Sequence, residues 1–237
     1  MRMRKKPNLV PRMERCEAVQ IKDPEALRGK WRESFGKSEL RLEIGCGKGS
    51  FTAATAEEAP DVLLVAIERV EDALVTAMER CMAAKLDNVR FVSDDALRLR
   101  EFFAPDEVGM IYINFCDPWP KSRDAKHRLT SPNFLRIYAD VLPVGGEIHF
   151  KTDNLPLFDW SEDIMRSEGW VIKDLTRNLP LGGVGGAPTD YETKFRAQGV
   201  RINYLTAVRA ENTKSGADGI PPRMRDAALA DARGANK

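Results

Sequence analysis

The sequence has few residues of the kinds that build disulfide frameworks and zinc sites. It contains four cysteines and two histidines among 237 residues. They are spread along the chain without a C-x-x-C pair, at Cys16, Cys46, Cys81, Cys116, His127 and His149. Because zinc sites draw on cysteine and histidine in closely spaced pairs, we expect no metal. Scattered cysteines are typical of a reducing compartment, so we expect a cytoplasmic protein.

Long apolar runs are missing as well. No run approaches the roughly 18 apolar residues that a membrane helix requires. The basic start, residues 1–6, is not followed by the apolar stretch of a signal peptide. We therefore expect a soluble chain with no membrane partner, and a length that favours a single domain with its own core.

The net charge is only +1, which by itself predicts no nucleic-acid partner. The charges are unevenly placed, however: residues 1–15 hold six basic side chains against Glu14 alone, and residues 121–128 hold four against Asp124. Either cluster alone is equally well explained as solvated surface charge. The two together favour patches that neutralise phosphates. We expect residues 1–37 to form a basic arm with little core.

Apolar runs rich in β-formers alternate with helical stretches. The expected strands are Leu40–Ile44, Leu63–Ile67, Val89–Ser93, Met110–Phe115, Glu147–Thr152, Trp170–Leu175 and Val200–Arg209. This alternation predicts an α/β fold with a mostly parallel sheet and helices on both faces. No long helix separates the last two strands, so we expect the final one to insert antiparallel. The domain is predicted over residues 38–210, with a disordered tail over residues 211–237.

Several polar residues have the spacing of helix caps. Ser131, followed by Pro132, and Asn154 are expected to begin helices. Thr189 and Glu192 have the spacing of a capping box, in which each side chain bonds a backbone N–H of the other residue. Capping and ligand binding are compatible roles, because the capped helix ends are expected to face the edge of the sheet at which a ligand would bind.

A glycine cluster follows the first strand, in the stretch Leu42–Gly49 (LEIGCGKG). Gly45 and Gly47 let the backbone turn tightly and approach a ligand. The order G-x-G-x-G differs from the G-x-G-x-x-G of nicotinamide sites, and Glu43 places a carboxylate where a pyrophosphate would need positive charge. A carboxylate suits a cationic ligand, and S-adenosylmethionine carries a sulfonium and an ammonium group without a phosphate. We therefore predict an S-adenosylmethionine site.

Further acids follow the next strands. Glu68 ends the second strand, where a carboxylate commonly accepts hydrogen bonds from ribose hydroxyls. Asp95 follows the third strand, at a place from which it could accept from the adenine amino group. Each acid alone is more simply a loop or cap residue. Together with Glu43 at one sheet edge, they favour a cofactor site.

The fourth strand runs into Asn114–Lys121 (NFCDPWPK), which brings Asp117, Trp119 and Lys121 to the same edge. Prolines on both sides of Trp119 restrict the backbone. An exposed indole stacks on a nucleobase for about 1–3 kcal/mol. The alternative is a turn whose tryptophan packs into the core.

Five motifs together resemble the bacterial tRNA (guanine-N7-)-methyltransferase family over residues 38–209. They are LEIGCGKG at 42–49, DPWPK at 117–121, KHRLT at 126–130, FKTDN at 150–154 and TDYETKF at 189–195. The resemblance implies a Rossmann-like class I methyltransferase with a seven-stranded sheet. It also implies tRNA as the partner, with a guanine of the variable loop as the target. The oligomeric state stays open between monomer and homodimer, and no obligatory protein partner is implied.

The resemblance also assigns roles to single residues. It implies cofactor binding by Glu43, Glu68, Asp95 and Asp117, with Asp117 also catalytic. It implies substrate binding by Lys121, Asp153, Thr189, Asp190, Tyr191 and Glu192, and RNA contacts by Arg123, Lys126, His127 and Arg128. The chain departs from the family pattern at Asp94, Cys116 and His127, and no motif acid is lost. Asp94 replaces a common glycine, which leaves Asp94 and Asp95 as alternatives for the adenine contact.

Guanine N7 has an in-plane lone pair, so we expect direct displacement with no prior removal of a proton. The target base is expected to be flipped and held against Trp119 or Tyr191, since a base buried in folded RNA is hard to reach. Three alternatives remain: a methyltransferase acting on an exocyclic amine, a nicotinamide oxidoreductase, and a non-catalytic RNA-binding module. The single proline between Asp117 and Trp119 disfavours the first, and Glu43 disfavours the second.

Overall fold

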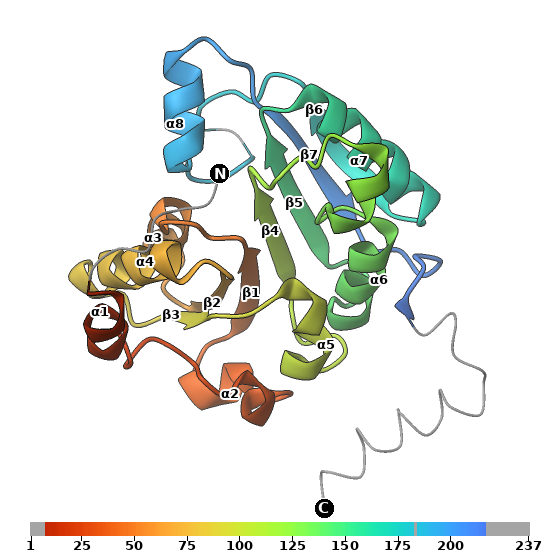
Figure 1. The fold of residues 1–237 in the computed structure, drawn as a ribbon. Coiled ribbons are helices and arrows are strands. Elements are labelled where there is room, and N and C mark those ends of the chain that lie inside the picture. The colour runs from red at the N-terminus through yellow and green to blue at the C-terminus, as the bar shows by residue number, and fades with distance from the viewer. Residues whose placement is uncertain (1–7, 183, 217–237) are drawn as a thin grey trace, which may run out of the picture.

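The computed structural model describes residues 8–182 and 184–216. Its centre is one seven-stranded sheet with the order β3-β2-β1-β4-β5-β7-β6 (Figure 1). The strands are β1 (Glu39–Ile44), β2 (Val62–Ile67), β3 (Val89–Val92), β4 (Met110–Asn114), β5 (Glu147–Thr152), β6 (Val171–Thr176) and β7 (Asn203–Val208). Strand β7 lies antiparallel to both of its neighbours, β5 and β6, while β1 to β5 pair in parallel. The predicted antiparallel insertion is confirmed.

Helices cover both faces of the sheet, as predicted (Figure 1). One face carries α1 (Leu9–Arg15), α3 (Ser50–Glu58) and α4 (Glu71–Ala83), and the other carries α5 (Leu99–Phe102), α6 (Pro132–Val141) and α7 (Leu155–Ser167). The remaining helices are α2 (Trp31–Phe35) and α8 (Asp190–Ala197), with 3-10 turns at Pro24–Leu27, Ala96–Arg98 and Ser122–His127.

Strand β2 shows why both faces need a cover. Its residues are apolar without alternation, and successive side chains point to opposite faces. Leu63, Val65 and Ile67 enter the core under α5, α6 and α7, whereas Leu64 and Ala66 enter the core under α3 and α4. The continuous apolar pattern therefore builds two cores from one strand.

The segment before residue 38 contributes core, so the expectation of an arm with little core is wrong for its described part. Trp31 is fully buried, and its indole N–H donates to the carbonyl of Phe102 at 2.9 Å. Gln20 forms a parallel bridge with Phe91, which extends the sheet beyond β3. Arg12 on α1 pairs with Glu79 at 2.5 Å. Residues 1–7, which hold most of the predicted basic cluster, lie outside the described residues.

The predicted disorder from residue 211 onward is also wrong for its first six residues, 211–216. Thr213 is buried and its hydroxyl donates to the carbonyl of Gly169 at 2.9 Å. The N–H of Gly216 donates to Asp140 at 3.2 Å. Residues 217–237 lie outside the described residues.

Among the residues that the structure describes, no helix is long and apolar enough to cross a membrane. The same residues contain no group of three or more His, Cys, Asp or Glu side chains that could hold a metal ion.

Candidate functional site

The carboxyl ends of β1, β2, β3, β4 and β5 meet at one edge of the sheet, and α8 lies beyond the ends of β4 and β5 (Figure 1). The register places Ile44 beside Ile67 and beside Ile113, and Asn114 beside Lys151. Parallel strands bring the residues that follow them together. The predicted acids of the glycine loop and of the next strand ends are therefore neighbours in space.

The loop after β1 depends on its glycines for two different reasons. Gly45, Gly47 and Gly49 all have positive φ, at 76°, 55° and 73°. A Cβ at Gly45 or Gly47 would meet no atom within 4 Å, so there the positive φ and not a close contact favours glycine. A Cβ at Gly49 would lie 2.6 Å from the Cβ of Ala77, so glycine there also lets α3 approach α4.

Glu43 is a buried carboxylate at the end of β1. It is 2% exposed and accepts a hydrogen bond of 2.6 Å from the hydroxyl of Thr52. Burial raises the pKa of Glu43 to about 7, and the Thr52 hydrogen bond opposes this rise. The positive charge of Lys151 also opposes the rise, and a buried carboxyl with a raised pKa beside a glycine loop is a candidate ligand-binding group.

Glu68 joins the glycine loop to the start of α4. One carboxylate oxygen accepts from the N–H of Gly47 at 3.1 Å and the other from the N–H of Val70 at 2.8 Å. Each carboxylate oxygen has a second lone pair for a ligand hydroxyl. The predicted ribose contact at Glu68 is therefore compatible with these bonds.

Asp94 and Asp95 both have protein partners. Asp95 accepts from the N–H of Leu97 at 2.9 Å and pairs with Arg69 at 3.0 Å. Asp94 pairs with Arg98 at 2.5 Å. Since both carboxylates are partly buried and paired, the geometry does not favour one of them as the adenine contact.

The turn after β4 exposes the carboxylate of Asp117, which has no hydrogen bond or ion pair within residues 8–182 and 184–216. Trp119 adopts a positive φ of 42° and lies against His127, with ring centroids 5.2 Å apart. It is half-buried and outside the apolar clusters of the core. The alternative that this tryptophan packs into the core therefore fails.

The basic cluster after this turn divides into two kinds of residue. Lys121, Arg123, Lys126 and His127 are exposed. Arg128 is half-buried, and its guanidinium donates to the carbonyls of Pro118 and Trp119, both at 3.0 Å. Four of the five residues thus have side chains accessible to a large partner.

Helix α8 begins as predicted at Thr189, whose hydroxyl accepts from the N–H of Glu192 at 2.9 Å. The other half of the predicted capping box is wrong. The buried carboxylate of Glu192 pairs with Lys151 at 3.0 Å and with Arg196 at 2.7 Å. Lys151 also donates to the carbonyl of Ala187 at 2.9 Å. A buried cation of β5 therefore outcompetes the local backbone for this carboxylate, and it fixes α8 to the sheet.

Replacing Thr189 with alanine should lower the free energy of unfolding by about 1 kcal/mol, because the N–H of Glu192 loses its acceptor at the helix start. Thr189→Ser keeps the hydroxyl and should stay close to the parent protein. Urea denaturation of the three proteins measures the difference. Equal losses in both variants would show that the methyl group, and not the cap, carries the effect.

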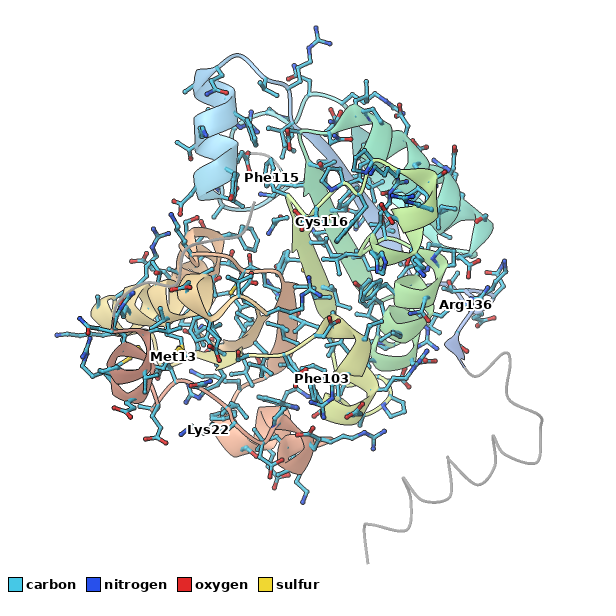
Figure 2. The ribbon with its side chains drawn as sticks, viewed as in Figure 1. Met13, Lys22, Phe103, Phe115, Cys116 and Arg136 are labelled. Atoms are coloured by element: carbon cyan, nitrogen blue, oxygen red, sulfur yellow. The ribbon has the colours of Figure 1, made fainter. Side chains whose placement is uncertain are left out.

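Other residues of α8 contact both the helices beside the glycine loop and the turn after β4. The N–H of Asp190 donates to Ser50 at 2.8 Å, and its carboxylate pairs with Arg80 at 3.3 Å. Tyr191 is 60% exposed and its ring stacks with Phe115, with centroids 6.4 Å apart and 24° between the planes. Figure 2 shows Phe115 at the carboxyl end of β4, close to α8. Phe195 stacks on both rings. The sequence reading did not single out Phe115 or Phe195.

Asn114 is the second residue that the sequence reading passed over. Asn114 is 8% exposed, and neither its amide nitrogen nor its amide oxygen makes a well-formed hydrogen bond in the described chain. It lies close enough to Glu43 to lower the pKa of that carboxyl. A buried amide whose contact with one carboxylate is poorly formed keeps bonding capacity for a ligand. The signal in the sequence was a polar residue ending an apolar strand.

Asp153 directly follows β5 and is half-buried. It precedes Asn154, which caps α7 as predicted by accepting from the N–H of Leu157 at 2.8 Å.

Comparison with known proteins gives consistent results. A family model described as a putative methyltransferase matches residues 37–205. The chain is 42% identical over 209 residues to the tRNA (guanine-N(7)-)-methyltransferase of Listeria monocytogenes serotype 4b, covering 87% of this chain and 98% of that protein. It is 40% identical over 217 residues to the protein of the same name from Halalkalibacterium halodurans, covering 91% and 99%.

The fold has relatives among solved structures. The 16S rRNA methyltransferase KamB aligns with a TM-score of 0.60 at 19% identity, over 77% of this chain and 93% of that one. A variant of the 16S rRNA (adenine(1408)-N(1))-methyltransferase from Catenulisporales acidiphilia, solved with S-adenosylmethionine, aligns with a TM-score of 0.56 at 13% identity, over 77% and 91%. The predicted Rossmann-like class I fold is confirmed.

Proposed function

The chain belongs to the family of bacterial tRNA (guanine-N7-)-methyltransferases, and from this premise we propose that it methylates N7 of a guanine in the variable loop of tRNA, with S-adenosylmethionine as the methyl donor. The observation that carries the proposal is that the groups needed for donor binding and for base binding lie at one edge of the sheet. This edge brings a buried carboxylate beside a glycine loop together with an exposed carboxylate, Asp117, and an exposed aromatic ring, Tyr191.

The residues at this edge fit the proposed donor. Glu43 offers a buried negative charge to a cationic group, and the adjacent Asn114 offers an amide without a well-formed hydrogen bond in the described chain. Glu68 keeps free lone pairs toward the loop and would hold the ribose. The open space at Gly45 and Gly47 lets a ligand approach the backbone closely. S-adenosylmethionine, when bound, supplies an electrophilic methyl group on a positively charged sulfur.

For methyl transfer to N7, the protein has to align the two reactants and stabilise the charge that develops. Guanine N7 would attack the methyl carbon with its in-plane lone pair as the sulfur–methyl bond breaks and S-adenosylhomocysteine leaves, so no side chain has to remove a proton first. Positive charge develops on the purine during transfer, and the carboxylate of Asp117 would stabilise it. The same carboxylate, or that of Asp153, would accept from the N1–H or the exocyclic amine of the guanine and fix its orientation.

Holding the guanine requires that it leave the RNA stack, and the exposed ring of Tyr191 is the better placed of the two candidate platforms. Its stacking on Phe115 and Phe195 fixes the plane of the ring. Trp119, the other candidate, lies against His127. Base–aromatic stacking is worth about 1–3 kcal/mol, enough to offset much of the cost of unstacking one base.

The exposed basic residues Lys121, Arg123 and Lys126 would bind phosphates on either side of the flipped base. Binding through phosphates releases counterions, so we expect tRNA affinity to fall steeply with salt.

The test is methyl transfer from labelled S-adenosylmethionine to bulk tRNA that lacks 7-methylguanosine, followed by nucleoside analysis. We expect the label in 7-methylguanosine. Label in an N2- or N6-methyl nucleoside would keep the methyl transfer and overturn the N7 assignment. Cofactor binding without transfer to tRNA would overturn the tRNA substrate.

A further inference from the structure

The turn between β4 and the Ser122–His127 3-10 helix lacks ordinary backbone support. Pro118 and Pro120 have no N–H to donate. Among the residues that the structure describes, no backbone–backbone hydrogen bond joins residues 116–120 to the rest of the chain. Trp119 has a φ of 42°, a conformation that a bulky side chain rarely adopts. Such a turn keeps its shape only when other groups hold it there.

Arg128 supplies the missing support. Its Nε donates to the carbonyl of Pro118 at 3.0 Å and its Nη2 to the carbonyl of Trp119 at 3.0 Å. The guanidinium lies over the ring of Trp160 on α7, with Cζ 4.3 Å from the centroid. Trp160 in turn packs against the core. The guanidinium is therefore fixed on one side by an indole and on its edge by two turn carbonyls.

Arg123, only five positions earlier, is different. Its side chain is 75% exposed, and within the described residues its one ion pair is with the neighbouring Asp124, at 3.9 Å. Arg128 forms no ion pair with any carboxylate in the described chain, so its hydrogen bonds to the turn are its principal polar contacts. The two arginines look alike in the sequence, but their surroundings give them separate functions.

We propose that Arg128 is a positioning residue that fixes the turn carrying Asp117, and that it is not a phosphate contact. Asp117 directly precedes Pro118, whose carbonyl Arg128 holds. Without the guanidinium, the turn loses both of its hydrogen-bonded anchors, and the carboxylate of Asp117 moves with it. A misplacement of about 1 Å can lower a rate about 100-fold. The kinetic consequence rests on the function proposed above.

Steady-state kinetics with tRNA separates the two arginines. Arg128→Ala should lower kcat about 100-fold with little change in the KM for tRNA. Arg123→Ala, the matched control, should raise the KM for tRNA with kcat unchanged, and it should make binding less sensitive to salt. A raised KM with normal kcat in Arg128→Ala would overturn the proposal and return Arg128 to the phosphate contacts.

Arg128→Lys sharpens the distinction between charge and shape. Lysine keeps the positive charge but cannot present two parallel donors in one plane. We expect kcat to fall nearly as far as in Arg128→Ala. Full activity in Arg128→Lys would mean that charge alone matters, which contradicts a positioning role.

A measurement without turnover tests the same claim and stays valid if the proposed function fails. The chain has four tryptophans, whose indole N–H groups give separate signals in a ¹⁵N-labelled protein. Arg128→Ala should shift the signals of Trp119 and Trp160 and leave those of the buried Trp31 and Trp170 in place. Arg123→Ala should shift none of the four. Unchanged Trp119 and Trp160 signals in Arg128→Ala would overturn the proposal.

Discussion

Asp117→Ala should lower kcat for tRNA methylation by about 10²–10³-fold, the range expected when one preorganised electrostatic group is removed from a transition state. The affinity for tRNA should stay close to the parent value, because phosphate contacts dominate it. The carboxylate is exposed and has no protein partner in the described chain, so its removal leaves no buried group unpaired. The melting temperature should therefore not change.

Single-turnover methylation and filter binding to tRNA measure the two quantities. Asp117→Asn separates two roles of the carboxylate, because asparagine can still accept a hydrogen bond from guanine but carries no charge. We expect an intermediate loss in Asp117→Asn. Asp163→Ala, which removes an exposed carboxylate from α7, is the control and should be fully active. A near-normal rate in Asp117→Ala would remove this residue from the mechanism.

The parts of the fold that the sequence predicts well are those governed by local pattern. The apolar run Leu63–Ile67 is typical of a strand buried on both faces, and it lies within β2; the G-x-G-x-G order is typical of a tight turn after a strand, and its glycines adopt positive φ. Asn154 and Thr189 cap their helices through bonds three residues away. Such features depend on neighbours in the chain and can be recognised without the fold.

The parts that were missed depend on distant contacts. Trp31 is buried because Phe102 and Phe103 lie above it, some 70 residues later in the chain. Glu192 gives up its capping bond because Lys151, 41 residues earlier, offers it a buried charge. The order of charges in a sequence cannot show whether a carboxylate binds a nearby backbone N–H or a distant buried cation.

Arg128 illustrates the same limit within the candidate site. In the sequence it belongs to a basic run, and a basic run predicts a phosphate-binding surface. Its guanidinium instead meets carbonyls ten and nine residues earlier, and an indole of α7. The direction in which a long side chain points is settled by packing, so residue type and spacing could not have shown it.

The buried carboxylate of Glu43 leads to a prediction about stability and pH. Its pKa in the folded protein is about 7, above the ordinary value of 4.5 for an unfolded glutamate. Between these two values the folded state binds more protons than the unfolded state, so stability falls as pH rises. Glu43 thus contributes its full stability below pH 4.5 and loses it as pH rises through 7. The loss is on the order of 3 kcal/mol.

Glu43→Gln keeps the shape and the acceptor for Thr52 but has no proton to lose. The variant should therefore gain stability relative to the parent protein as pH rises from 5 to 8, by up to about 3 kcal/mol. Urea denaturation at both pH values measures this gain. Glu57→Gln, an exposed position on α3, is the control and should show no such change with pH. An equal difference at both pH values would mean that Glu43 does not titrate in this window.

The same variant tests the proposed role of the carboxylate. If Glu43 pairs with a cationic group of S-adenosylmethionine, Glu43→Gln should weaken binding by about 10- to 100-fold, the worth of one hydrogen bond to a charged group. Parent affinity should also increase from pH 5.5 to pH 7 as the carboxyl ionises, while the affinity of the variant stays flat. Calorimetry at both pH values gives the two affinities. A variant that is more stable at pH 8 but binds the cofactor normally would separate the buried charge from cofactor binding, and Asn114 would then be the next residue to test.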